Sequence, residues 1–123
     1  MKLVSTDSTF IASADATLAA IGTALDVALA GRGDGDDDGT DWSLNDGILE
    51  IDCADGSKLI VNRHVPNREI WVAARSGGFH FRADAGTWRD SRSGGELAAQ
   101  LTLLLRDQAG LVVDLTGLPP PAI

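Results

Sequence analysis

The chain of 123 residues is poor in several residue types, and each shortage excludes a class of protein. A single cysteine, Cys53, excludes an internal disulfide and favours a reducing compartment. No apolar run approaches the roughly 18 residues that a membrane-spanning helix needs. The first residues, 1–7, lack the apolar segment of a signal peptide. We therefore expect a cytoplasmic protein that has no membrane partner.

Basic residues are also scarce, with ten Lys and Arg against eighteen Asp and Glu and a net charge of −8. This balance argues against general nucleic-acid binding, which needs a basic surface. The charge is also unevenly divided. Residues 1–57 hold twelve acids and two bases, whereas residues 58–110 hold five acids and eight bases. Such a bipolar domain steers cations or basic partners to one end.

Two amphipathic helices are predicted, one near each end of the chain. Residues 8–30 carry an apolar stripe at three- and four-residue steps, with Asp7 or Ser8 as the N-cap and Gly31 as the stop. Residues 94–109 form the second helix, opened by a capping box of Ser93 and Glu96. A tail over 110–123 follows, and its prolines exclude further helix.

Between the helices lie a loop over 31–41, rich in glycine and aspartate, and a run of about six short strands over 42–90. Short links with Asp-Gly turns favour antiparallel neighbours. Two helices can bury their stripes only by packing on one face of this sheet. We therefore predict a single α+β domain over 1–123, a two-layer sandwich whose second sheet face meets solvent. Cys53 and Trp88 have inward parity and are expected in the core.

The solvent face of the predicted sheet carries an unexpected aromatic residue. Strand alternation puts Ile70 and Val72 inside and Trp71 outside, among polar residues. A large aromatic on a wet sheet is typical of a surface that meets a partner. The alternative is an isolated aromatic that packs on its neighbours. His64 and His80 share this face, and we expect satisfied surface histidines there.

The loop places five carboxylates within eight residues: Asp34, Asp36, Asp37, Asp38 and Asp41. Hard cations prefer such oxygen ligands. The spacing matches the first half of an EF-hand loop, but Asn45 stands where the bidentate glutamate is required. No histidine or cysteine lies in the run, so a metal site here would be exposed and weak. The alternative is a solvated loop that binds nothing specifically.

An ordered set of residues between Gly47 and Gly110 resembles the frataxin family, most closely its bacterial branch. The set comprises Asn62-Arg63, Pro66, Ile70-Trp71, Gly77-Gly78-Phe79-His80-Phe81, Trp88 and Arg92-Ser93-Gly94-Gly95-Glu96. The resemblance implies the same two-layer fold. It also implies an acidic ridge that binds iron and contacts a cysteine desulfurase, here Asp26, Asp34, Asp36, Asp37, Asp38 and Asp41. Only Asp26 remains on the last turns of the helix, where relatives often carry more carboxylates.

The resemblance further implies that the sheet face contacts the iron–sulfur scaffold and the desulfurase. Asn62 and Trp71 match the family, and His64 and Glu69 stand at its glutamine-like positions. The function implied is a non-enzymatic adaptor of iron–sulfur cluster assembly that binds Fe²⁺ or Fe³⁺ weakly and uses no organic cofactor. We expect a monomer at rest; the family can associate when loaded with iron. The alternatives are a ferroxidase or iron-storage protein and a plain acidic interaction domain.

Overall fold

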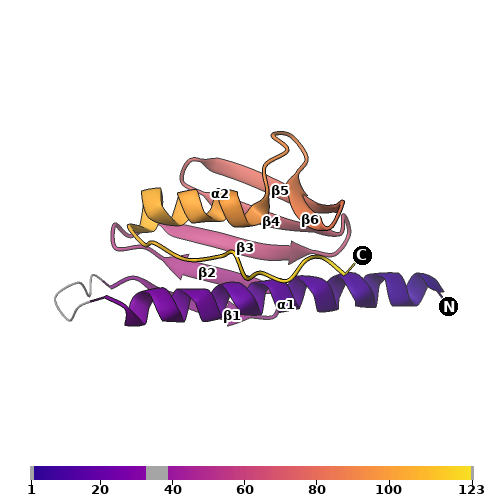
Figure 1. The fold of residues 1–123 in the computed structure, drawn as a ribbon, viewed down its shortest axis with the longest axis horizontal. Coiled ribbons are helices and arrows are strands. Elements are labelled where there is room, and N and C mark those ends of the chain that lie inside the picture. The colour runs from indigo at the N-terminus through magenta and orange to yellow at the C-terminus, as the bar shows by residue number, and fades with distance from the viewer. Residues whose placement is uncertain (1, 33–38, 123) are drawn as a thin grey trace.

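The computed structural model, which describes residues 2–32 and 39–122, has two layers (Figure 1). Helices α1 (Lys2–Ala30) and α2 (Leu97–Leu104) cover one face of a six-stranded antiparallel sheet. The strands are β1 (Asp41–Asn45), β2 (Ile48–Asp52), β3 (Lys58–His64), β4 (Glu69–Ala74), β5 (Gly77–Asp84) and β6 (Thr87–Asp90). The other face of the sheet carries no helix among the described residues. The predicted α+β sandwich is confirmed.

The strands follow one another as a meander, β1 to β6 in chain order. The two-residue turns Asp46-Gly47 and Ala85-Gly86 have positive φ at both positions, the geometry that matches the twist of a hairpin. Gly47 is needed for space as well, because a Cβ there would lie 2.6 Å from the Arg63 guanidinium. Arg63 in turn donates to Asp15 of α1 at 2.5 Å, and this bond joins the helix to the sheet.

The core lies between the helices and the inner face of the sheet. Phe10 of α1 meets the edge of Trp88 at 6.2 Å between ring centroids, and Cys53 is buried in the same core, so both inward predictions are confirmed. The core side chains that are fully buried come from both layers: Phe10, Leu18, Ile21, Leu25, Leu49, Leu59, Val61, Ile70, Phe81, Leu101 and Leu105.

Helix α1 begins six residues earlier than predicted. The carboxylate of Asp7, predicted as an N-cap, lies inside the helix and accepts from Arg68 Nη2 at 2.7 Å. Residues 7–30 are long and apolar enough to cross a membrane by length and composition alone. Their apolar stripe is buried against the sheet, as it is in the core helix of a globular protein.

Helix α2 begins three residues later than predicted, and the capping box does not form. Glu96 is the N-cap residue without a side-chain capping bond, while Ser93 Oγ donates to Asp90 at 2.8 Å. Ser93 is therefore used by the preceding turn. The helix continues in wider π-type turns over Leu105–Ala109 and stops at Gly110, as predicted, with φ at 64°.

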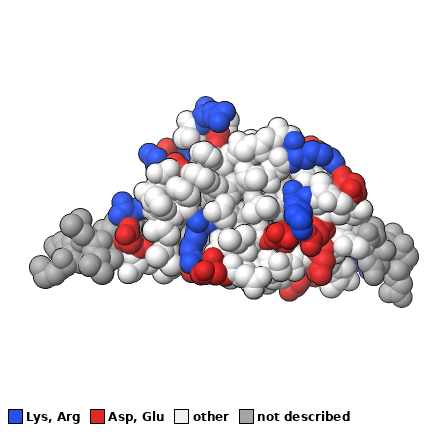
Figure 2. Space-filling model, turned by 180° about the vertical axis from the view of Figure 1, so that it is seen from behind, with Lys and Arg blue, Asp and Glu red and all other residues white. Residues whose placement is uncertain are grey.

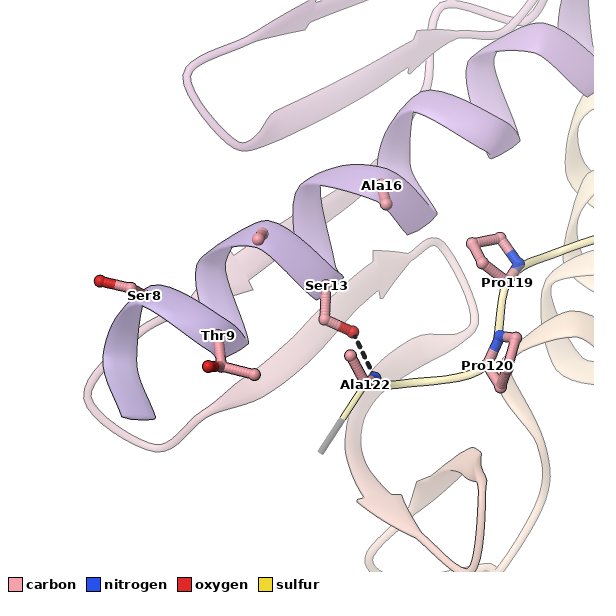
Figure 3. Close-up of a pocket in the computed structure, with 8 residues that line it drawn as sticks. Ser8, Thr9, Ser13, Ala16, Pro119, Pro120 and Ala122 are labelled. Atoms are coloured by element: carbon pink, nitrogen blue, oxygen red, sulfur yellow. Dashed lines mark hydrogen bonds between the residues drawn. The ribbon is translucent and has the colours of Figure 1, made fainter. Parts of the chain in front are cut away.

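The tail runs as an extended strap between the two helices (Figure 1). Leu111, Val113 and Leu115 are buried, whereas Val112 is 81% exposed, because alternate residues of an extended chain face opposite sides. Near its end the Ala122 amide donates to Ser13 Oγ of α1 at 2.9 Å (Figure 3). The strap is thus tied to the first half of α1.

Candidate functional site

The helix-free face of the sheet carries Trp71 in a row of side chains from neighbouring strands. The register pairs Asn62 of β3 with Trp71 of β4, and Trp71 with His80 of β5. Ile48, which pairs with Asn62, is 49% exposed on the same face. Figure 2 shows an uncharged area in the middle of this face, with charged side chains on either side of it. The structure places Trp71 here, half-buried, as the strand alternation predicted.

The indole of Trp71 lies between two imidazole rings. The ring centroids of His64 and Trp71 are 3.6 Å apart with the planes inclined by 9°, and those of Trp71 and His80 are 4.4 Å apart at 11°. Three planar rings from three adjacent strands therefore form one continuous stack. The two histidines, predicted as satisfied surface residues, instead cover both faces of the tryptophan.

Glu69 is buried beside this stack, and only 4% of the residue is exposed. Its Oε1 accepts from Trp71 Nε1 at 2.8 Å, and its Oε2 accepts from Arg82 Nη2 at 2.9 Å. His80 Nδ1 lies 4.0 Å from Oε1. A carboxylate removed from water needs such partners, because a buried charge without them is costly. Glu69 was expected to contact a partner; its burial makes it a support for Trp71 instead.

Asp90 at the end of β6 holds the backbone behind His80. Its Oδ1 accepts from the His80 amide at 2.9 Å, and its Oδ2 accepts from both the amide and the hydroxyl of Ser93 at 2.8 Å. Burial opposes ionisation of this carboxyl, but the donors from Ser93 and His80 outweigh it and hold the pKa of Asp90 below its usual range. The turn 91–95 is therefore fixed to the strand that carries His80.

A second cluster on the free face is charged and internally paired. Lys58 Nζ lies 2.7 Å from Asp52 Oδ1 and 2.8 Å from Glu50 Oε2. The hydrogen bonds that Lys58 donates to Asp52 and then to Glu50 raise its pKa above the ordinary value. All three side chains are substantially exposed, so the pairs contribute little to stability.

The acidic end of the molecule is described only in part. Trp42 joins its two described members, because its Nε1 donates to Asp26 of α1 at 2.8 Å and its amide donates to Asp41 of β1 at 2.8 Å. The predicted ligands Asp34, Asp36, Asp37 and Asp38 lie outside the described residues. Within the described ranges, no group of three or more His, Cys, Asp or Glu side chains is arranged to hold a metal ion. Trp42 thus connects Asp26 of α1 to the strand that begins with Asp41, and the metal-binding role of both aspartates stays a prediction.

Two hollows on the helical side lack the chemistry of an active site. One, of about 530 Å³, lies between α1 and the strap and is lined by Ser8, Thr9, Ser13 and small apolar residues (Figure 3). The other, of about 670 Å³, lies between α2 and the strap, and Glu96 is its single carboxylate. Neither gathers the acid, base and nucleophile that catalysis by side chains requires.

The sequence analysis placed His80 and Asp26 on the surface but missed two of their contacts. These are the stack of His80 on Trp71 and the bond between Asp26 and Trp42. The pairing of β4 with β5 would have placed His80 opposite Trp71, because Gly77-Gly78 marks the turn and fixes the register. The bond from Trp42 to α1 has no comparable signal, since it depends on how the helix crosses the sheet.

Comparison with known proteins supports the family expected from the sequence. The family model described as "Frataxin-like domain" matches residues 3–111. A protein of Dechloromonas aromatica named iron-sulfur cluster assembly protein CyaY is 47% identical over 110 residues, which is 89% of this chain and 97% of that protein. A protein of the same name from Burkholderia mallei is 42% identical over 107 residues, 87% of this chain and 94% of that one.

Solved structures agree with the sequence relatives. The frataxin of Psychromonas ingrahamii superposes with a TM-score of 0.76 at 31% identity, over 89% of this chain and 97% of its own. A trimeric frataxin from Saccharomyces cerevisiae, complexed with ferrous iron, gives a TM-score of 0.51 at 27% identity over 57% and 63% of the two chains. The fold, the matched motifs and these relatives show that the chain belongs to the frataxin family, in its bacterial CyaY branch.

Proposed function

We propose that this protein is an iron-responsive, non-enzymatic adaptor of iron–sulfur cluster assembly in the cytoplasm. The relatives are named for that assembly, and a yeast relative has been solved with ferrous iron. The observation that carries the proposal is a pair of distinct surfaces on one small domain. One is the acidic end around Asp26 and Asp41, and the other is the sheet face that carries the ring stack of Trp71.

The acidic end collects Fe²⁺ or Fe³⁺ weakly and docks on a basic patch of the cysteine desulfurase. Carboxylates alone are hard oxygen ligands that suit such ions, and exposed ligands hold them loosely. Among the described residues there is no closed ligand set, which supports exposed binding rather than a buried di-iron centre. The aspartates 34, 36, 37 and 38 adjoin this end in the sequence and add to its charge.

The sheet face contacts the complex of the desulfurase with the iron–sulfur scaffold. Trp71 and Asn62 are the contact residues that match the family, and Ile48 adds exposed apolar surface beside them. Aromatic residues in the centre of an interface supply a large share of binding energy. Through both contacts the adaptor changes the rate of cluster formation. At rest it is a monomer, because its charge of −8 opposes self-association.

Binding to the desulfurase, measured by calorimetry at several salt concentrations, tests the acidic end. Changing Asp34, Asp36, Asp37 and Asp38 to Asn removes four charges, so we expect affinity to fall about tenfold or more at low salt, with a weaker dependence on salt. The control neutralises the exposed Asp114 of the strap, which lies outside both proposed contact surfaces. Affinity that stays unchanged in the fourfold variant would overturn the electrostatic docking.

The ferroxidase alternative is tested by mixing the protein with Fe²⁺ without oxygen and then adding oxygen. The adaptor binds iron and returns it without turnover. Repeated catalytic oxidation, faster than in the protein with the four aspartates neutralised, would contradict the non-enzymatic role.

A further inference from the structure

The stacked rings give Trp71 an unusual presentation. Both faces of the indole are covered, one by His64 and the other by His80, and its N–H is taken by Glu69. A tryptophan held in this way cannot stack on an aromatic ring or a guanidinium of a partner. What it offers is the carbon rim of the indole, fixed in one orientation. A contact residue fixed before binding loses less conformational entropy when the partner arrives.

The two histidines are not equivalent. His64 Nδ1 is buried and has no hydrogen-bond partner, so a proton placed there would be a buried donor without an acceptor. The His80 side chain is 45% exposed, and its Nδ1 lies 4.0 Å from the Glu69 carboxylate. A proton on His80 would therefore be close to a negative charge and reachable from solvent. It would also place a cation over the face of the indole, which attracts cations.

The charged groups around His80 are few, and each has a place on a neighbouring element. On β4 it faces Glu69, and on β5 Arg82 bonds the far oxygen of that same carboxylate. On β6, Asp90 is bound to the His80 amide and Arg89 pairs with Glu96 at 3.8 Å. On β2 and β3, Glu50 and Lys58 pair with each other, and Lys58 also pairs with Asp52. Glu69 is thus the carboxylate that faces the imidazole.

We propose that His64 and His80 are positioning residues that clamp Trp71 for its partner, and that protonation of His80 tightens the clamp. His64 supplies a constant stacking surface from one side. His80 supplies a stacking surface from the other side, and this surface becomes a cation whenever the imidazole is protonated. The sheet face therefore presents a better-ordered tryptophan to the assembly complex when His80 carries the additional proton. This inference rests on the proposed contact of Trp71 with that complex.

The clamp itself is tested by NMR on the isolated protein, with no partner present. Imidazole protons that lie over an indole face are shifted upfield by its ring current. We expect such shifts for both histidines in the wild type and their loss in Trp71→Leu. In His80→Ala the indole N–H signal should broaden or move, whereas His80→Phe should preserve it because a ring still stacks. Imidazole signals at ordinary positions in the wild type would overturn the clamp.

Binding to the desulfurase–scaffold complex then tests the role of the clamp, at about pH 8 and about pH 5.5. We expect Trp71→Ala to lose about tenfold or more in affinity and His80→Ala about threefold at about pH 8, with His80→Phe close to wild type. At the lower pH, wild type should gain about threefold relative to His80→Phe. His64→Phe is the control, and it should keep the pH response of the wild type.

The outcomes separate the clamp from the proposed function. If Trp71→Ala binds normally, the sheet face is not the contact and the proposed function fails, while the NMR result still stands alone. A different result separates the two proposals. Trp71→Ala loses binding, His80→Ala binds like wild type, and wild type and His80→Phe change in affinity equally between the two pH values. The proposed function then holds and the positioning role of the histidines is wrong.

Discussion

Among single residues, Asp90 shows how one carboxylate can order a whole turn. It accepts three hydrogen bonds, from the His80 amide and from the amide and hydroxyl of Ser93. The Ser93 oxygen accepts from the Gly95 amide, and Gly94 has a φ of 76°, which a helix beginning there does not allow, so α2 starts at Leu97 without a side-chain cap. The same carboxylate fixes the backbone that carries His80, so a core-facing residue supports the opposite face of the sheet.

Asp90→Asn should lower the free energy of unfolding at about pH 7 by about 1–2 kcal/mol, because the amide leaves part of the donor set unsatisfied. The pKa of Asp90 is depressed in the folded protein, so its ionised form contributes stability above the unfolded pKa, and this is lost as pH falls through the folded pKa. Urea unfolding of both proteins from neutral pH to below about pH 4 should therefore show the difference shrinking.

Exposed Asp84→Asn serves as the control for that series and should follow wild type. Equal free energies of unfolding for Asp90→Asn and wild type at neutral pH would contradict this account of Asp90. A difference that stayed the same size in acid would contradict it as well.

Among elements, the contact between α1 and β1 depends on a glycine in mid-helix. A Cβ at Gly22 would lie 2.7 Å from Cη2 of Trp42, and the Trp42 ring is held in place by its bond to Asp26. Glycine weakens a helix interior, so its presence here needs a reason, and the indole that packs over it supplies one. The helix and the first strand are thereby held together at the acidic end.

Gly22→Ala should destabilise the protein by about 1–3 kcal/mol through overpacking, although alanine is the better helix former. In the background of Trp42→Leu the same change should stabilise by about 0.5–1 kcal/mol, because the clash is gone and only helix propensity remains. Urea unfolding of the four proteins in a double-mutant cycle measures this reversal of sign. Destabilisation in both backgrounds would show that the indole is not the obstacle.

The elements were largely predictable from the sequence because periodicity and turn residues mark them directly. The run of six strands and the end of the second helix at residue 109 agree with the structure, and Trp71 and Trp88 lie on the faces that alternation assigned. The hydrogen-bond partner that a given side chain takes was not predictable from the sequence. Ser93 could bond forward to the helix or back to Asp90, and the pattern of residues favours the first while the folded turn uses the second.

The candidate site also has a part that the sequence predicts and a part that it does not. The position of Trp71 follows from period two, but the burial of Glu69 depends on rings and a guanidinium brought in from β3 and β5. The spacing of residues along one strand does not show how far side chains from the neighbouring strands bury a residue on it. The metal ligands predicted at 34, 36, 37 and 38 fall outside the described residues and stay a prediction.

At the scale of the whole molecule, the strap over 111–122 completes the core between the helices. Leu111, Val113 and Leu115 are nearly fully buried, and the family match ends at residue 111. Burial of an aliphatic side chain contributes about 1.5–3 kcal/mol relative to exposure, so three of them make up a sizeable part of the stability of a small domain.

Truncation after Gly110 should lower the free energy of unfolding by about 4 kcal/mol or more, or leave the domain unfolded. Truncation after Leu118 removes the bond from Ala122 to Ser13 but keeps the three buried side chains, and should cost about 1 kcal/mol. Calorimetric melting of the two truncated proteins beside the full chain measures both losses. If the protein truncated after Gly110 melted at the same temperature as the full chain, the strap would contribute nothing to stability.

The bond between Ala122 and Ser13 also decides how this protein should be immobilised for measurement. It brings the end of the chain next to the early turns of α1, and Ala30 lies about 25 Å further along the same helix. A tether at the carboxyl terminus would thus leave both Asp26 and the indole rim open to an incoming protein. Surface-based assays can then read either contact without the anchor obstructing it.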